Sequence, residues 1–212
     1  MSAELSPLFA AIKATYAAQP PSKHSVLGPS SAYKWTACPA SIAMEQAGGY
    51  KDSAGSSARK GTFQHFVSAY CLEHGHSAAE FIGLQETVEG EDFTFDKDMA
   101  ELCQTYIDTV LSYVGDDGIL FVEQQLDISW ITGEEGAVGT ADAIIVRNGE
   151  LIVIDLKTGL NDVDAVENQQ LTIYAAAALR MWNEGTLKAP AVQISTPPVT
   201  ESAPADDGDD LL

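Results

Sequence analysis

The sequence predicts an α/β fold in which a mixed central sheet is flanked by helices. Three observations support this prediction. The spacing of apolar residues changes from a helical to a strand-like period near residue 118. Asn148-Gly149 joins two apolar runs, which is a strong hairpin signal. The composition, 212 residues with 45% apolar and 20% charged side chains, is typical of one domain with appendages.

The N-terminal half contains the predicted helices. Residues 29–47 open with Pro-Ser-Ser, which favours a capped helix, although an internal proline makes it irregular. Residues 62–75 and 97–114 carry apolar side chains at helical spacing, so each should bury one face. Residues 48–61 are rich in glycine and serine and predict a loop. Residues 84–98 are acidic and predict a short hairpin or loop.

The C-terminal half contains the predicted sheet. Runs with strand character occupy residues 119–128, 141–147, 150–157 and 191–195. A helix over 165–183 should cross from the third of these strands to the last.

These elements divide the chain into three parts. We expect an N-terminal arm over 1–28, a single domain over 29–198 and a disordered acidic tail over 199–212. Within the domain, the helical part spans 29–115 and the sheet core spans 119–198.

Charge and cysteine content exclude several classes of protein. No stretch approaches the roughly 18 apolar residues of a membrane span, and no basic start precedes an apolar run as in a signal peptide. Cys38, Cys71 and Cys103 are too few and too widely spaced for a disulfide framework or a four-cysteine metal site. We expect them to be small buried hydrophobic residues, with no iron–sulfur cluster, in a cytoplasmic protein.

The net charge of −20 is unevenly distributed along the chain. Residues 1–60 carry a net charge of +3, residues 61–200 carry −18 and residues 201–212 carry −5. Nucleic-acid binding therefore cannot be judged from the net charge alone.

The predicted hairpin brings two carboxylates together. If Asn148-Gly149 is a two-residue turn, Asp142 lies directly opposite Asp155 on one face of the sheet. Like charges at that spacing repel each other, so the pair must share a proton or bind a cation, and oxygen ligands favour Mg²⁺ or Mn²⁺. Strand alternation places Lys157 on the same face as Asp155, where it can orient a water molecule or act only as a counter-ion.

Three motifs now occur in order: Gly139-Thr140-Ala141-Asp142, Asp155-Leu156-Lys157 and Gln170-Leu171-x-x-Tyr174. This arrangement resembles the PD-(D/E)xK nuclease superfamily, and within it the RecB-like exonuclease branch. The segments Trp35-x-x-Cys38-Pro39 and Lys60-Gly61-Thr62-x-x-His65 resemble the start of phage- and prophage-encoded members of that branch, which usually carry Glu in place of Lys60. The resemblance covers about residues 24–197 and implies a restriction-endonuclease-like fold.

The resemblance also implies a metal site. Asp142 and Asp155 would bind Mg²⁺ or Mn²⁺, with the Leu156 carbonyl as a third ligand and His65 as an additional one. Glu123 lies in a strand where the family often has Glu, and it would be a further acid near the metal or a solvated side chain. His65 lies on the opposite side of its helix from Phe63, away from the apolar stripe, so it should face something other than the main core.

The remaining implied roles concern catalysis. Lys157 would handle the attacking water, while Gln170 and Tyr174 would orient the site or the DNA strand. Gln170 and Tyr174 are four residues apart and share a helix face, although Tyr174 also fits a core position.

The function implied is that of a metal-dependent deoxyribonuclease, an exonuclease in phage or prophage DNA recombination or processing inside a bacterial host cell. Two alternatives stay open: a structure-specific or restriction-type endonuclease, and a non-catalytic module that binds DNA ends or a partner. We expect Lys51, Arg59 and Lys60 to bind DNA, since they flank a Gly/Ser-rich segment in the basic part of the chain. The acidic tail would be a solubilising end or would dock a recombination or single-strand-binding protein.

Overall fold

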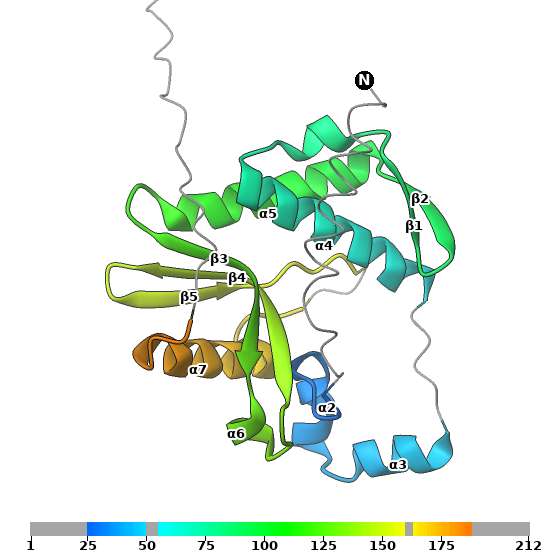
Figure 1. Cartoon of the computed structure of the whole chain (residues 1–212). Helices are drawn as coiled ribbons and strands as arrows, with labels where there is room; N and C mark the ends of the chain where they lie inside the picture. The colour runs from blue at the N-terminus through cyan, green and yellow to red at the C-terminus, as the bar shows by residue number, and fades with distance from the viewer. Residues whose placement is uncertain (1–24, 50–54, 160–162, 188–212) are drawn as a thin grey trace, which may run out of the picture.

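The computed structural model describes residues 25–49, 55–159 and 163–187. The strands β3, β4 and β5 form an antiparallel sheet, and β1 and β2 form a separate hairpin. Helices α4 and α5 lie on one side of the main sheet and α7 lies on the other (Figure 1). The core accordingly forms two clusters of buried side chains, one on each side of this sheet.

The described helices and strands have the following bounds. The helices are η1 (Pro29–Ser31), α2 (Ala32–Ala37), α3 (Ser41–Gly48), α4 (Ser56–His74), η2 (Ala78–Phe81), α5 (Lys97–Val114), α6 (Ser129–Thr132) and α7 (Gln169–Asn183). The strands are β1 (Gln85–Val88), β2 (Glu91–Thr94), β3 (Ile119–Asp127), β4 (Val138–Arg147) and β5 (Glu150–Ile154).

The α/β class is confirmed, but the mixed character of the sheet is not seen in the described strands, which are all antiparallel. The strand expected at 191–195, which would have been reached by the crossover helix, lies outside the described residues. So do most of the expected arm at 1–28 and all of the tail at 199–212. No helix in the described ranges has both the length and the apolar character needed to cross a bilayer.

The segment expected to be one irregular helix is divided in two. α2 ends before Pro39, whose ring prevents a continuous helix, and α3 begins at Ser41. The chain is attached to the domain already at Ser25, whose hydroxyl donates to the Val138 carbonyl at 2.8 Å and accepts from the Val138 amide at 2.9 Å. Cys38 is exposed, which corrects the expectation that all three cysteines are buried, whereas Cys71 and Cys103 lie in the core.

Helix α4 begins at Ser56, so the loop predicted over 48–61 is wrong for its last six residues. Contacts with the β1–β2 hairpin explain the difference, because the Arg59 guanidinium lies 2.9 Å from Glu91 and the Ser56 hydroxyl donates to the same carboxylate. Tertiary contacts therefore override a composition that is typical of a loop. The hairpin itself confirms one of the two forms expected for residues 84–98.

Helix α5 has the bounds that the sequence predicts. The Asp96 carboxylate accepts from the Met99 amide at 2.8 Å and caps its first turn. Helix α7 begins at Gln169, four residues later than expected, because Asn168 caps it by accepting from the Leu171 amide at 3.0 Å.

The β4–β5 hairpin has the predicted register. Arg147 pairs with Glu150, and the pairing continues without a shift to Ala143 and Ile154. Asn148 and Gly149 have φ angles of 52° and 79°, as a type I′ turn requires. The next positions in this register are Asp142 and Asp155, just beyond the last residue of β5.

Strand β3 changes the phase of its alternation at Glu123. Leu120 and Val122 pack in the first core cluster, with α4 and α5, whereas Leu126 packs in the second cluster, with α7. Strict alternation would place all three on one face. Glu123 lies at the change with a φ of 47°, a conformation that is uncommon for residues other than glycine. The interruption frees this side chain from the regular alternation of the strand.

Candidate functional site

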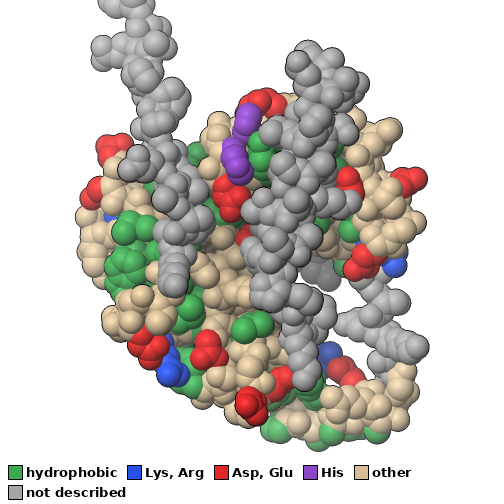
Figure 2. Space-filling model, viewed as in Figure 1, with side chains coloured by type: hydrophobic (Ala, Val, Ile, Leu, Met, Phe, Trp, Pro, Cys, Tyr) green, Lys and Arg blue, Asp and Glu red, His purple; other side chains and the backbone are tan. Residues whose placement is uncertain are grey.

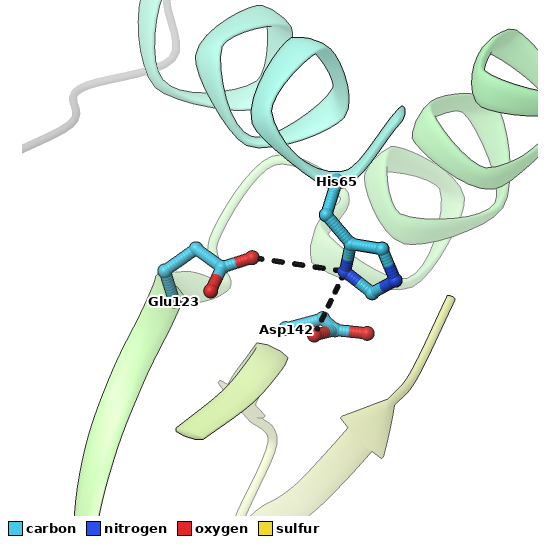
Figure 3. A group of neighbouring side chains, drawn as sticks. All are labelled: His65, Glu123 and Asp142. Atoms are coloured by element: carbon cyan, nitrogen blue, oxygen red, sulfur yellow. Dashed lines mark ion pairs between the residues drawn. The ribbon is translucent and has the colours of Figure 1, made fainter. Parts of the chain in front are cut away.

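Three ligand-bearing side chains from distant parts of the chain meet beside the main sheet (Figure 3). His65 extends from α4, Glu123 from β3 and Asp142 from β4. The His65 Nδ1 atom lies 3.3 Å from Asp142 Oδ1 and 3.9 Å from Glu123 Oε1. One ligand atom from each residue lies within 4.8 Å of the others, so this group can hold a metal ion.

Glycine at position 139 lets β4, the strand that carries Asp142, pack closely against η1 and α7. A Cβ atom there would lie 2.8 Å from Pro29 Cγ and 2.9 Å from Tyr174 Cε1. Real Cβ contacts are essentially never that short. The glycine of the Gly-x-x-Asp motif therefore allows η1 and α7 to approach β4 directly.

A second polar group lies around Asp155. The Lys157 Nζ atom is 2.7 Å from Asp155 Oδ2, and the Gln170 amide donates to Asp155 Oδ1 at 2.8 Å. Lys157 also donates to Gln170 Oε1 at 2.8 Å, and Gln170 Nε2 lies 3.4 Å from the Tyr174 hydroxyl. The first turn of α7 therefore positions both the lysine and the acid.

Leu156 connects the His65–Glu123–Asp142 group with the polar group around Asp155. Its backbone amide donates to Asp142 Oδ2 at 2.6 Å, while its side chain is buried in the first core cluster. The structure thus shows a contact of the Leu156 amide, whereas the resemblance to PD-(D/E)xK nucleases implies that the Leu156 carbonyl binds the metal. Ile152 and Ile154 pack against the same cluster as Leu156, so this face of the segment is apolar.

The electrostatics around the His65–Glu123–Asp142 group favour a cation. Burial, followed by the charge of Asp142, raises the pKa of Glu123 to about 8. Burial and Asp142 also raise the pKa of Asp155. Burial acts to lower the pKa of His65, but the hydrogen bond and charge of Asp142 outweigh it, and the pKa is raised. Buried acids with too little positive charge around them, together with one imidazole, are a donor set that a divalent ion fits.

Tyr174 combines the two roles that the sequence left open. It is buried in the second core cluster, and its hydroxyl is next to Gln170. Burial raises its pKa, so the phenol stays neutral and can donate a hydrogen bond.

Those residues expected to bind DNA that the structure describes contact acidic side chains. The Arg59 guanidinium contacts Glu91 at 2.9 Å and Glu89 at 3.4 Å, and Lys60 Nζ lies 3.7 Å from Asp96. Lys51 lies outside the described residues. The sequence carries no signal for this pairing, since the acidic partners lie about 30 residues further along the chain.

The same pairing extends to every Lys and Arg that the structure describes. Each lies within 4 Å of a carboxylate, in the pairs Lys34–Glu45, Arg59–Glu91, Lys60–Asp96, Lys97–Glu101, Arg147–Asp117, Lys157–Asp155 and Arg180–Glu184. Acidic side chains outnumber basic ones on the face shown in Figure 2. No described cation is therefore free of an acidic partner.

Sequence reasoning missed two residues that line the small cavity beside the first group. Ser68 follows His65 by three positions on α4, and Tyr106 reaches the cavity from α5. The i, i+3 spacing of His65 and Ser68 is a signal that could have indicated the first of these. The position of Tyr106 depends on how α5 packs on α4, which no local pattern reveals.

Fold and site together define an α/β protein with a candidate metal centre beside the middle of β3 and β4, just past the end of β5. Residues 24–193 match the family model described as protein of unknown function DUF2800, and the chain therefore belongs to this family. No solved structure matches the chain.

Proposed function

We propose that this protein is a metal-dependent deoxyribonuclease, and specifically an exonuclease that acts in phage or prophage DNA recombination or processing. One observation carries the proposal. The His65–Glu123–Asp142 group, which can hold a metal ion, is connected through Leu156 to an acid–lysine pair at Asp155 and Lys157. A structural ion site has no need of that lysine, whereas in phosphodiester hydrolysis a lysine can orient the attacking water and stabilise negative charge on the phosphate.

The proposed chemistry assigns a task to each group. Mg²⁺ or Mn²⁺ bound by the acids would supply the charge that stabilises the phosphate and eases ionisation of water. Lys157 orients the attacking water and offers positive charge to the developing oxyanion. Gln170 fixes Lys157 and Asp155 through its two hydrogen bonds, and Tyr174 supports Gln170.

The test is incubation of the protein with end-labelled linear DNA and with closed circular DNA, each single- and double-stranded, in Mg²⁺, Mn²⁺ or EDTA. We expect ion-dependent release of short products from linear DNA and none from closed circles. Cleavage of closed circles would identify an endonuclease instead. No cleavage of any substrate would contradict the nuclease proposal.

A matched pair of variants controls this experiment. Asp155→Asn should abolish cleavage, because it removes a charge from the acid–lysine pair. Asp98→Asn makes the same chemical change at an exposed position in the first turn of α5, and it should cleave like the wild type.

A further inference from the structure

A groove of about 470 Å³ adjoins the acid–lysine pair. Its lining includes Pro29 and Tyr33 from η1 and α2, Val163 and Asp164 from the segment before α7, and Lys157 of the acid–lysine pair. Its volume falls within the range of sites that hold a small molecule or one unit of a polymer. The groove is thus continuous with the centre where the proposed reaction takes place.

Tyr33 is presented to this groove by the geometry of α2. Ala32 is buried, and the Trp35 indole donates to the Gly28 carbonyl at 3.0 Å while its ring packs against the second core cluster. With these two residues directed to the core, Tyr33 lies on the opposite side of the helix and is 67% exposed. An exposed aromatic ring that lines a groove next to a reaction centre is a surface on which a flat group can stack.

Charge in the groove argues against a phosphate as its occupant. Lys157 is the one cation among the described lining residues, it belongs to the proposed reaction centre and it lies 2.7 Å from Asp155. The rest of the described lining offers no cation to a second phosphate, and Asp164 adds a negative charge. The other polar residues of the lining are neutral: Ser30, Asn168, Gln170 and the exposed amide Gln169 at the start of α7. The lining therefore suits a neutral aromatic ring that carries hydrogen-bond donors, such as the amino groups of a nucleobase.

We propose that this groove binds one unstacked nucleobase of the substrate, next to the scissile phosphate, with Tyr33 as the ring on which it stacks. The inference rests on the proposed nuclease function and adds a recognition element to it. A base inside a duplex is stacked on both sides and cannot reach Tyr33, so the nucleotide held here must be unpaired. The groove thus selects single-stranded DNA or a frayed end.

The test measures binding of fluorescein-labelled single-stranded oligonucleotides by anisotropy, with Ca²⁺ in place of Mg²⁺ so that binding is read without cleavage. Tyr33→Ala should weaken binding by about 10-fold, within the range measured for loss of one stacked base. Tyr33→Phe retains the ring and should bind like the wild type. Tyr113→Ala removes another exposed tyrosine, on α5, and should also leave binding unchanged.

Oligonucleotides with one abasic nucleotide, moved stepwise along the strand, locate the base in the groove. At one position, loss of the base should weaken binding to the wild type about 10-fold and have little further effect on Tyr33→Ala. Equal affinity of wild type and Tyr33→Ala for every oligonucleotide, or no binding by the wild type, would overturn the subsite. If DNA is cleaved but its binding does not depend on Tyr33, the subsite is rejected and the nuclease proposal stands. Tyr33-dependent binding without any cleavage rejects the nuclease proposal and retains the subsite.

Discussion

The Glu123 carboxyl group is half-buried near Asp142 and Asp155, and its ionisation should control the stability of the metal-free protein. Its pKa is raised from an ordinary value near 4.5 to about 8 in the folded state. As pH rises through this interval, the unfolded chain releases its proton first, so the folded state loses stability. Glu123→Gln should therefore be more stable than the wild type in EDTA near pH 9, by at most on the order of 5 kcal/mol, and the difference should vanish near pH 4.

Denaturant unfolding of both proteins across this pH range measures the effect. A difference that does not change with pH would mean that Glu123 ionises normally. Mn²⁺ should reverse the order at high pH, because a cation stabilises only the protein that retains the carboxylate.

Lys157 should be needed for turnover and not for metal binding. Lys157→Ala should lower the rate of DNA cleavage by about 100-fold or more, because it removes charge stabilisation from the transition state. Its thermal stabilisation by Mn²⁺ should persist, since the His65–Glu123–Asp142 group is unchanged. Cleavage kinetics and melting curves recorded on the same preparation separate the two effects. Turnover near the wild-type rate would reduce Lys157 to a counter-ion of Asp155.

At the level of single residues, the sequence predicted which side chains meet but not how they touch. The register of an Asn-Gly hairpin is fixed by its turn, so the positions of Asp142 and Asp155 followed from arithmetic on one strand pair. The turn of Glu123 out of the strand alternation depends on one φ angle of 47° and leaves no pattern in the sequence. The amide of Leu156 was equally invisible, because backbone groups carry no sequence signal.

The β1–β2 hairpin should compete with DNA for the first turns of α4. Glu89 and Glu91 both contact Arg59, a residue expected to bind DNA. Replacing both acids by Gln should tighten binding of a single-stranded oligonucleotide and steepen its dependence on salt, because one cation becomes available to phosphate. Adding Arg59→Ala to the double variant should cancel the gain. Unchanged affinity in the double variant would place the DNA path away from this hairpin.

At the level of elements, the sequence predicted the bounds of a helix best where residues directly next to the helix fix its ends. Helix α5 has the predicted bounds because Asp96 caps its start and Gly115 follows its last residue. Helix α4 began earlier than predicted because distant acids on the hairpin hold its first turn. Such contacts join residues about 30 positions apart and lie beyond any local window.

For the molecule as a whole, the pairing of every described Lys and Arg with an acid predicts an unusual mode of DNA binding. In the part of the chain that the structure describes, few cations are free to contact phosphate, so we expect the divalent ion to supply most of the attraction there. Affinity for a single-stranded oligonucleotide should fall sharply when EDTA replaces Ca²⁺. In Ca²⁺, a plot of log affinity against log salt should have a slope no steeper than about −2. A slope far steeper than this would show that basic side chains dominate binding.

The type I′ turn that sets the register of the site also makes the protein sensitive to chemical ageing. Asn148 and Gly149 are exposed, and glycine leaves its amide nitrogen unshielded. That nitrogen can attack the Asn148 side-chain carbonyl, release ammonia and form a succinimide, which opens to isoaspartate. Isoaspartate adds one methylene group to the backbone of a two-residue turn, so the alignment of Asp142 with Asp155 would be lost.

Stored at alkaline pH, the wild type should therefore lose its stabilisation by Mn²⁺ as isoaspartate accumulates in peptide maps. Asn148→Gly retains the turn without the side-chain amide and should keep that stabilisation; loss at the same rate in both proteins would show that the damage lies elsewhere.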